Sequence, residues 1–504
     1  MTRETGATRT SAFWPLPVPA STARRRLYGL LASLLLAGQA LPLRAAEVLE
    51  LQLDGLSLPI DLHQLQAWGR NPDQSTSDLA IWLNLLDGRS RRNLVQLLQA
   101  PLLRDRSFGQ QLLGSWTGEQ LLNEVGELLL QGDARSASQR PLNSAAQLRQ
   151  TVNDLLAKRG ELSSLDLLLA LPSRHITLQL DGVIELAQQW RQQLQLQQRA
   201  WRRLTALGLP SRSATPLQLS QQGSSLRQLQ PLSVAHRPQP LPLELWPPEG
   251  RPRHAWVVLM PGLGGSGDQL SWLAGALAHW GWPVVVLEHP GSDADAMKAS
   301  LQGQRPPPGA ESLAERLADV QAVLSAQRQG RLEALGVPPG TPVVLMGHSL
   351  GGLTALMATG LRPERGLAQR CRQALRRLPL TNLSRLLQCQ LSSQAALKPL
   401  DTTDPATPVA AVVSFSGFGS LLWPHGSLAT LKPPLLMVGG SLDLITPPLQ
   451  EQLALFASQH HPRSRLALID GASHFSPVRV NGKGSDLFQL GDDLVGVDPR
   501  KVQA

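Results

Sequence analysis

A serine flanked by glycines follows an apolar run in the second half of the chain. The pentapeptide GHSLG, residues 347–351, comes directly after the run 343–346 and before the helix-compatible run 352–358. The pentapeptide alone is a common pattern, but a strand, a tight turn and a helix in this order expose a serine hydroxyl at the edge of a sheet. The glycines suit the turn because it strains the backbone and leaves no room for side chains. We therefore predict that Ser349 is a nucleophile, and a plain glycine-rich turn is the alternative.

A serine hydroxyl becomes nucleophilic when a base accepts its proton and an acid orients that base. In a strand–turn–helix arrangement of this kind, the acid and the histidine follow later strands, in the order serine, acid, histidine. Asp443 and His474 each come shortly after an apolar run late in the chain. We predict that His474 is the base and that Asp443 orients it. Asp401 and Asp404 remain alternative acids, and Asp443 could instead only cap a turn.

Acyl transfer also requires two backbone N–H groups that bind the oxyanion of the tetrahedral intermediate. We predict that Leu350, which follows the nucleophile, supplies one and that Leu263, in the loop MPGLGG after an early apolar run, supplies the other. A phosphate-binding loop is disfavoured because neither G-x-G-x-x-G nor a P-loop lysine is present. Histidine, cysteine and acidic residues show no metal-ligand spacing. We therefore predict no cofactor and no metal.

The elements that would position these residues are short apolar runs that alternate with helical patterns from about residue 233. Their residues are apolar on both faces, which suits strands covered by helices on both sides of a sheet. Alternation of strands and helices over this length predicts an α/β fold with a mostly parallel sheet. The runs are residues 256–260, 284–287, 343–346, 409–413, 435–438 and 466–469.

The preceding part of the chain has a different pattern. Residues 48–53 alternate as a strand does and end at Asp-Gly, and the pentapeptide LQLDG at 51–55 recurs at 178–182. Between these repeats, apolar residues return every three or four positions, as in amphipathic helices. We predict a mainly helical domain over 47–190, either closed by two short strands or carrying a chance repeat. Residues 191–232 are predicted to form a helix and a linker, 233–490 the α/β domain, and 491–504 a C-terminal tail.

The first 46 residues predict export. Three arginines at 24–26 precede the apolar stretch 27–43, and small residues follow at 45 and 46, the order found in a secretory signal peptide. A membrane anchor is the alternative, but seventeen residues interrupted by Gly, Gln and Pro span a bilayer only marginally. We therefore predict a periplasmic or secreted protein.

Composition narrows the class of protein further. The chain has 504 residues, 42% of them apolar, which is enough for more than one buried core and excludes wholesale disorder. The net charge is +9, but six arginines and one glutamate lie within the first 46 residues, so the remainder is only weakly basic. Basic runs interleaved with aromatic residues are absent from the remainder, which argues against a nucleic-acid partner.

Cys371 and Cys389 are the only cysteines in the chain. An even pair in an exported protein is normally oxidised. We predict that they form a disulfide in the insertion between the helix after Ser349 and the run 409–413. Neither is a candidate for catalysis.

The second half of the chain resembles α/β-hydrolases of the predicted dienelactone hydrolase and platelet-activating-factor acetylhydrolase-like group. The whole chain resembles the cyanobacterial-type members, which carry an N-terminal helical domain of unknown function. Two departures are clear: the oxyanion loop begins Pro261-Gly262 where the family usually has His-Gly, and dienelactone hydrolases proper use a cysteine nucleophile. The segments that carry the resemblance are EHPGS at 288–292, GHSLG at 347–351, NLS at 382–384, LLQC at 386–389, GSLD at 440–443 and GASHFS at 471–476.

These residues together predict an exported serine esterase that acts on carboxylic esters, either lipid-like or short-acyl, through an acyl-enzyme. An acyltransferase with the same three side chains and a non-catalytic binding protein are the alternatives. The expected partner is a small-molecule or lipid ester, and a peripheral contact with a membrane is left open. We expect His289 to shape its loop, with a contact to substrate as the alternative. The sequence does not specify the oligomeric state.

Overall fold

The computed structural model describes residues 46–104, 108–132, 142–206, 227–377, 379–393, 406–424 and 427–478. The predicted signal peptide, the two alternative acids Asp401 and Asp404, and the predicted C-terminal tail lie outside these residues, apart from Ala46. Within the described segments, no helix is both long and apolar enough to span a bilayer.

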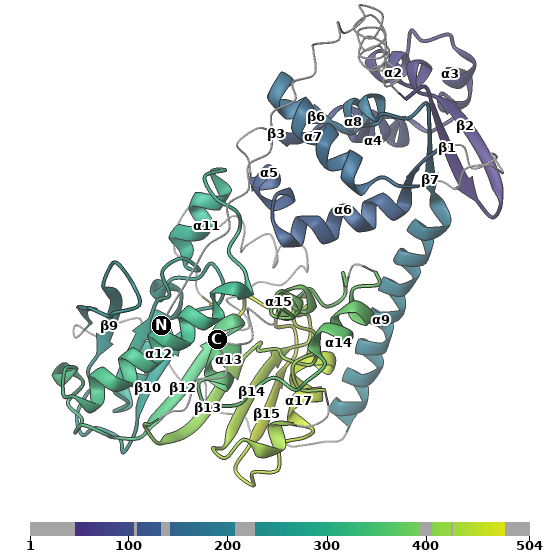
Figure 1. Ribbon diagram of the computed structural model, residues 1–504. Helices are drawn as coiled ribbons and strands as arrows, with labels where there is room; N and C mark the ends of the chain where they lie inside the picture. Colours follow the sequence, from purple (N-terminus) through teal and green to yellow (C-terminus); the bar gives the residue numbers. More distant parts are fainter. Residues whose placement is uncertain are drawn as a thin grey trace, which may run out of the picture. The chain divides into compact units, whose positions relative to one another are not determined.

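The second half of the chain forms an eight-stranded sheet in the order β15-β14-β13-β12-β10-β11-β9-β8 (Figure 1). Within this sheet, β9 pairs antiparallel with both of its neighbours, and all the other pairs are parallel. The strands are β8 (Gln228–Leu232), β9 (Leu241–Trp246), β10 (Trp256–Met260), β11 (Val284–Leu287), β12 (Val343–His348), β13 (Val409–Phe415), β14 (Leu435–Gly440) and β15 (Arg465–Ile469).

The predicted α/β fold is confirmed, and the six apolar runs correspond to β10 through β15. The sequence patterns missed β8 and β9, and β8 lies inside the segment predicted as a linker. Both contain a proline, Pro231 and Pro242, and these two residues face each other in the antiparallel pair. Proline donates no backbone hydrogen bond, so a sequence pattern that contains it indicates an edge or a loop.

Helices pack on both faces of this sheet because its strands are apolar on both faces. From β10, Val258 and Met260 join the core that contains α12 and α13, whereas Val257 and Leu259 join the core that contains α10. The helices are α10 (Ser271–His279), α11 (Ala294–Leu301), α12 (Leu313–Arg328), α13 (Leu350–Met357), α14 (Leu367–Ala374), α15 (Ser384–Gln390) and α17 (Ala454–Phe456). This layering leaves the loops at the strand ends as the place for a functional site.

The first half contains helices and, beyond what the sequence predicted, two small sheets. One has the order β2-β1-β7-β4-β5 and the other pairs β3 with β6. The strands are β1 (Val48–Leu53), β2 (Leu56–Asp61), β3 (Pro101–Arg104), β4 (Leu129–Gln131), β5 (Leu142–Asn143), β6 (Glu161–Ser163) and β7 (His175–Gln179). The helices are α2 (Leu62–Arg70), α3 (Asp78–Leu83), α4 (Gly88–Gln99), α5 (Phe108–Leu113), α6 (Trp116–Leu128), α7 (Ala145–Arg159), α8 (Ser164–Ala170) and α9 (Leu180–Ala206).

The repeated pentapeptide LQLDG has a structural counterpart. The first leucine and the glutamine of each copy pair in parallel: Leu51 and Gln52 of β1 lie opposite Leu178 and Gln179 of β7. The two Asp-Gly steps then diverge. Asp54 and Gly55 both have positive φ, 49° and 76°, and turn the chain into β2, whereas Asp181 lies in the first turn of α9. The carboxylate of Asp181 accepts the N–H of Asp54 at 3.1 Å, so the second copy supports the turn made by the first.

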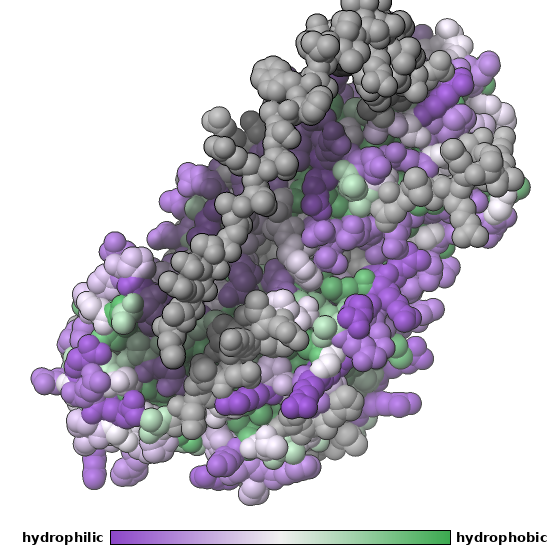
Figure 2. All heavy atoms as spheres, viewed as in Figure 1, coloured by the Kyte–Doolittle hydropathy of each residue, from purple (hydrophilic) through white to green (hydrophobic). Residues whose placement is uncertain are grey.

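In the part of the chain that the structure describes, many more large apolar residues are buried than exposed. On the face shown in Figure 2, hydrophilic residues dominate and apolar residues gather in small separate patches. The large apolar clusters are instead built from buried residues of the strands and helices named above.

Candidate active site

The residues singled out in the sequence converge on the carboxyl ends of β10, β12, β14 and β15, which lie in one part of the sheet. Ser349 follows β12, Leu263 lies in the loop after β10, Asp443 follows β14 and His474 follows β15. In a parallel sheet the carboxyl ends of all strands lie at the same end of the sheet, and such folds bind their ligands there. The structure thus places these four predicted site residues at the carboxyl end of the sheet.

The backbone of Ser349 is strained, as expected of a serine in a strand-to-helix turn. Its φ is 52° and its ψ is −117°, a region that side-chain-bearing residues rarely adopt. The two glycines of the motif are needed for space. A Cβ on Gly347 would lie 2.3 Å from the Gly351 carbonyl, and a Cβ on Gly351 would lie 2.4 Å from the carbonyl oxygen of Met260. The turn can therefore close only with glycine at both positions.

Ser349, His474 and Asp443 form a continuous hydrogen-bonded series. The Ser349 hydroxyl lies 3.0 Å from Nε2 of His474, and Nδ1 of His474 lies 2.9 Å from Oδ2 of Asp443. With the Nδ1–H directed at the carboxylate, Nε2 is free to accept the serine proton. Asp443 is fully buried, and the other two residues are nearly so.

The carboxylate of Asp443 has several donors besides His474. The N–H groups of Ile445 and Thr446 donate to Oδ1 at 3.0 and 2.7 Å, and the Thr446 hydroxyl lies 2.6 Å from Oδ2. Burial alone would raise the pKa of Asp443, but the His474 ring and the hydrogen bonds from His474 and Thr446 outweigh burial and hold this pKa below its ordinary value. Asp443 is thus an anion that can stabilise an imidazolium.

His348 is a site residue that the sequence analysis did not single out. Its Nε2 donates to the carbonyl oxygen of His474 at 2.8 Å, and the two ring centroids are 4.9 Å apart. Burial, together with the nearby His474 ring, lowers the pKa of His348 to about 3, so the ring stays neutral and adds no positive charge beside the base. Its place between glycine and serine in GHSLG was the only available signal.

A small pocket of about 30 Å³ lies at the carboxyl end of the sheet. Gly262 and Leu263 border it together with Ser349 and His474. Leu350, the second predicted oxyanion donor, is the first residue of α13 and is fully buried. Leu263 thus shares the pocket with Ser349, and Leu350 directly follows that serine.

Two family profiles match the chain. A profile described as "Alpha/beta hydrolase family" matches residues 257–481, which contain Ser349, Asp443 and His474. The chain thus contains an α/β-hydrolase domain. A profile described as "Alpha/beta hydrolase of unknown function (DUF1400)" matches residues 45–179, which precede the α/β-hydrolase domain. No curated protein sequence matches the chain.

Two solved structures are similar to part of the chain. A dienelactone hydrolase from Anabaena variabilis is 20% identical, with 53% of this chain and 96% of that chain covered and a TM-score of 0.32. Esterase 2 from Thermogutta terrifontis is 16% identical, with 54% of this chain and 91% of that chain covered and a TM-score of 0.31.

His289 and Asp470 lie away from the hydrogen-bonded series of the α/β-hydrolase. His289 is buried, and its Nδ1 donates to Asp319 at 2.9 Å, so it belongs to the interior of its loop, and the residues that border the pocket do not include it. The carboxylate of Asp470 accepts the Ser441 hydroxyl at 2.9 Å. Of the candidate acids, Asp401 and Asp404 lie outside the described residues.

The α/β-hydrolase contains a disulfide between Cys371 in α14 and Cys389 in α15. Both cysteines are buried, and the bridge closes a segment with a sequence separation of 18. Within the described residues, no three histidine, cysteine or acidic side chains are grouped as metal ligands.

Proposed function

We propose that this α/β-hydrolase is an exported serine esterase that cleaves carboxylic esters, lipid-like or short-acyl, through an acyl-enzyme. The observation that carries the proposal is the hydrogen-bonded series in which the Ser349 hydroxyl lies 3.0 Å from Nε2 of His474 and Nδ1 of His474 lies 2.9 Å from Asp443. Three side chains in this order are what nucleophilic catalysis by serine requires.

In the proposed reaction, Nε2 of His474 accepts the Ser349 proton while the serine oxygen attacks the ester carbonyl carbon. The N–H groups of Leu263 and Leu350 bind the resulting oxyanion. When the tetrahedral intermediate collapses, His474 returns its proton to the departing alcohol, and the acyl group stays on Ser349. A water molecule, deprotonated by His474, then releases the carboxylic acid by the same two steps in reverse.

The surroundings of the three side chains support this assignment. A buried, ionised Asp443 favours the imidazolium that forms on His474 during the attack. The neutral His348 holds the backbone of His474 without competing for that charge. Ser349 also precedes the N-terminus of α13, where the helix dipole favours developing negative charge.

The proposal that the protein is exported rests on two features. The first is the order of basic, apolar and small residues within 1–46. The second is the disulfide between Cys371 and Cys389, because disulfides persist mainly outside the reducing cytosol. We expect the mature chain in the periplasm or the medium, with residues 1–46 removed.

Hydrolysis of p-nitrophenyl esters of increasing acyl length, from acetyl upward, is the test of the proposed activity. We expect turnover by the wild type and a loss of at least about 1,000-fold in kcat for Ser349→Ala, because removing the nucleophile leaves only binding and the oxyanion donors. His474→Ala should be nearly as severe and Asp443→Asn somewhat less so. Wild-type turnover that survives Ser349→Ala would rule out this mechanism.

A fluorophosphonate probe separates the esterase from a non-catalytic binding protein, since only an activated serine reacts with it. We expect labelling at Ser349 in the wild type and none in Ser349→Ala. Adding an alcohol acceptor to the ester assay tests the acyltransferase alternative. A new ester formed in preference to the free acid would favour the transferase.

A further inference from the structure

Arg316 is a cation enclosed in the interior behind the loop that carries Leu263. It lies in the first turns of α12 and is 1% exposed. Its guanidinium makes four hydrogen bonds, all of them to neutral oxygens, and it pairs with no carboxylate among the described residues. Burial lowers the pKa of Arg316 to about 9. Burying a cation without a carboxylate partner costs free energy, so the burial of Arg316 requires a functional explanation.

Two of the four bonds hold consecutive carbonyls of the loop after β10. Nη1 donates to the carbonyl oxygen of Pro261 at 3.0 Å, and Nη2 donates to that of Gly262 at 3.0 Å. The peptide that contains the Gly262 carbonyl also contains the N–H of Leu263, and the described chain has no cis peptide. In a trans peptide the carbonyl and the N–H point in opposite directions. Arg316 therefore turns the Leu263 N–H away from itself.

The side of the loop opposite to Arg316 faces the nucleophile. A Cβ placed on Gly262 would lie 3.2 Å from the Cβ of Ser349 and 3.0 Å from Nδ1 of His348. Gly262 and Leu263 border the pocket that Ser349 and His474 share, and Arg316 does not. The Leu263 N–H itself donates to no acceptor among the described residues. It is thus a free donor on the pocket side of the loop.

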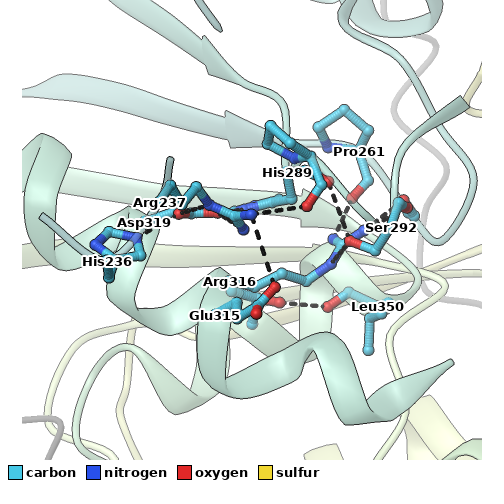
Figure 3. Close-up of polar contacts among 12 residues, drawn as sticks. His236, Arg237, Pro261, His289, Ser292, Glu315, Arg316, Asp319 and Leu350 are labelled. Atoms are coloured by element: carbon cyan, nitrogen blue, oxygen red, sulfur yellow. Dashed lines mark hydrogen bonds and ion pairs between the residues drawn. The ribbon is translucent and has the colours of Figure 1, made fainter. Parts of the chain in front are cut away.

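Ser292, the last residue of the EHPGS segment, links a second loop to the same arginine. Its hydroxyl accepts Nε of Arg316 at 2.8 Å, and its carbonyl oxygen accepts Nη2 at 3.2 Å (Figure 3). The same carbonyl accepts the N–H of Gly264 at 2.8 Å. The loop that carries Leu263 is therefore held at 261 and 262 by Arg316 and at 264 by Ser292.

A neighbouring set of contacts on α12 holds the start of the EHPGS segment. Asp319, fully buried and one turn after Arg316, accepts Nδ1 of His289 at 2.9 Å and Nε of Arg237 at 2.6 Å. Arg237 also donates to the carbonyl of Pro290 at 2.9 Å. Arg237 makes no bond to the loop after β10 among the described residues, which makes it a suitable control.

We propose that Arg316 is a positioning residue for the oxyanion hole: by binding the Pro261 and Gly262 carbonyls from behind, it directs the Leu263 N–H toward the position of the oxyanion beside Ser349. The inference rests on the proposed esterase function. It also assigns a purpose to the unpaired buried charge, because a cation with several donors can hold adjacent carbonyls in one orientation. Arg316 itself touches neither substrate nor the reacting atoms.

The test compares Arg316→Met with the matched control Arg237→Met. Methionine keeps an unbranched apolar stem and removes every donor. We expect Arg316→Met to lower kcat for a p-nitrophenyl ester by about 10- to 100-fold, less than the loss from deleting an oxyanion donor outright, with little change in KM. Affinity for a trifluoromethyl ketone, whose adduct with Ser349 carries an oxyanion, should fall by the same factor. Arg237→Met should keep kcat close to that of the wild type.

One further variant and a crystal structure keep the inference testable. Arg316→Lys, which can hold one carbonyl, should recover part of the lost kcat. If Arg316→Met does not fold, Arg316→Lys decides, and an unchanged kcat and ketone affinity in that variant would overturn the proposal. Equal losses of kcat in Arg316→Met and Arg237→Met would also overturn it, because they would indicate a general role in stability.

The crystal structure of Arg316→Met is a readout that does not depend on turnover. We expect the Gly262–Leu263 peptide to be rotated or to occupy more than one orientation. An unchanged peptide would contradict the positioning role. A wild type without turnover on any ester would instead count against the proposed function, and the peptide orientation would still decide the role of Arg316.

Discussion

The hydroxyl of Thr446 lies 2.6 Å from Oδ2 of Asp443, the oxygen that also lies 2.9 Å from Nδ1 of His474. The same hydroxyl is 3.3 Å from Nδ1 of His474 and 3.1 Å from the carbonyl oxygen of Ser416. Thr446 therefore touches both the acid and the base, and its backbone N–H fixes the other carboxylate oxygen. These contacts hold the carboxylate of Asp443 next to Nδ1 of His474.

Thr446→Val should lower kcat for ester hydrolysis by about tenfold, because a hydrogen bond to a charged group is lost while the backbone N–H bond and the side-chain volume are kept. KM should change little. Thr446→Ser, which restores the hydroxyl, is the matched control and should have near-wild-type kcat. Steady-state kinetics of the three proteins checks this, and a valine variant as active as the serine variant would show that the hydroxyl is dispensable.

The strained backbone at Ser349 predicts a gain in stability when the side chain is removed completely. Glycine adopts φ near 52° without a Cβ penalty, whereas alanine retains the strain. Ser349→Gly should therefore be more stable than Ser349→Ala by about 1 kcal/mol, as the relief of strain exceeds the greater chain entropy of glycine. Urea unfolding of both inactive variants measures the difference. Equal stability of the two variants would mean that the backbone conformation at residue 349 is not strained.

Two buried neutral histidines predict that stability falls on acidification. The pKa of His289 is lowered to about 4 by burial and by the charge of Arg316, and the pKa of His348 is lowered to about 3 by burial and by His474. Each folded-state pKa lies below the unfolded value of 6.5. The stability contributed by each neutral ring is thus fully present above pH 6.5 and is lost as the pH falls toward the folded-state value.

Between pH 7 and pH 5, each ring should reduce the free energy of unfolding by about 2 kcal/mol. His289→Gln, which can still donate to Asp319, should remove the share due to His289 and flatten the pH dependence by that amount. His254→Gln is the control, because His254 is exposed and its ring is in water in both states. Urea unfolding at the two pH values provides the measurement. A His289→Gln slope equal to that of the wild type would contradict a buried neutral ring.

The disulfide joins α14 to α15 and predicts a change in stability without a change in chemistry. Replacing both Cys371 and Cys389 by serine should lower the free energy of unfolding by up to about 3 kcal/mol, because the open chain gains conformational entropy. The kcat should be unchanged, since neither cysteine borders the pocket. Under reducing conditions the wild type should unfold like the double variant. Mass spectrometry of the non-reduced protein should find the two cysteines in one linked peptide, and two freely alkylated thiols would reject the bridge.

The sequence by itself determined the strands that are apolar on both faces and the order in which the site residues follow them. Runs such as 256–260 and 343–346 have no other stable place than the interior of a sheet covered on both sides, because no polar face is left for solvent. The glycines of GHSLG were equally informative, since a tight strand-to-helix turn leaves no room for side chains, and at Gly347 the crowding comes from Gly351 within the motif itself. Ser349, Asp443 and His474 followed from that order.

The tertiary structure alone decided what supports these residues. Thr446 and Arg316 belong to no sequence motif described above, and the role of His348 does not follow from its place in GHSLG. Arg316 and His348 act through contacts with residues far away in the sequence, and Thr446 acts through its position in a buried network. Arg316 lies 54 residues from Gly262, and His348 lies 126 residues from His474. The strands β8 and β9 were missed for a similar reason: each contains a proline, which obscures the strand pattern, and they are held in the sheet by the pairing of β8 with β9 and of β9 with β11. Local propensity cannot encode such contacts, because their energy exists only once the chain has brought both partners together.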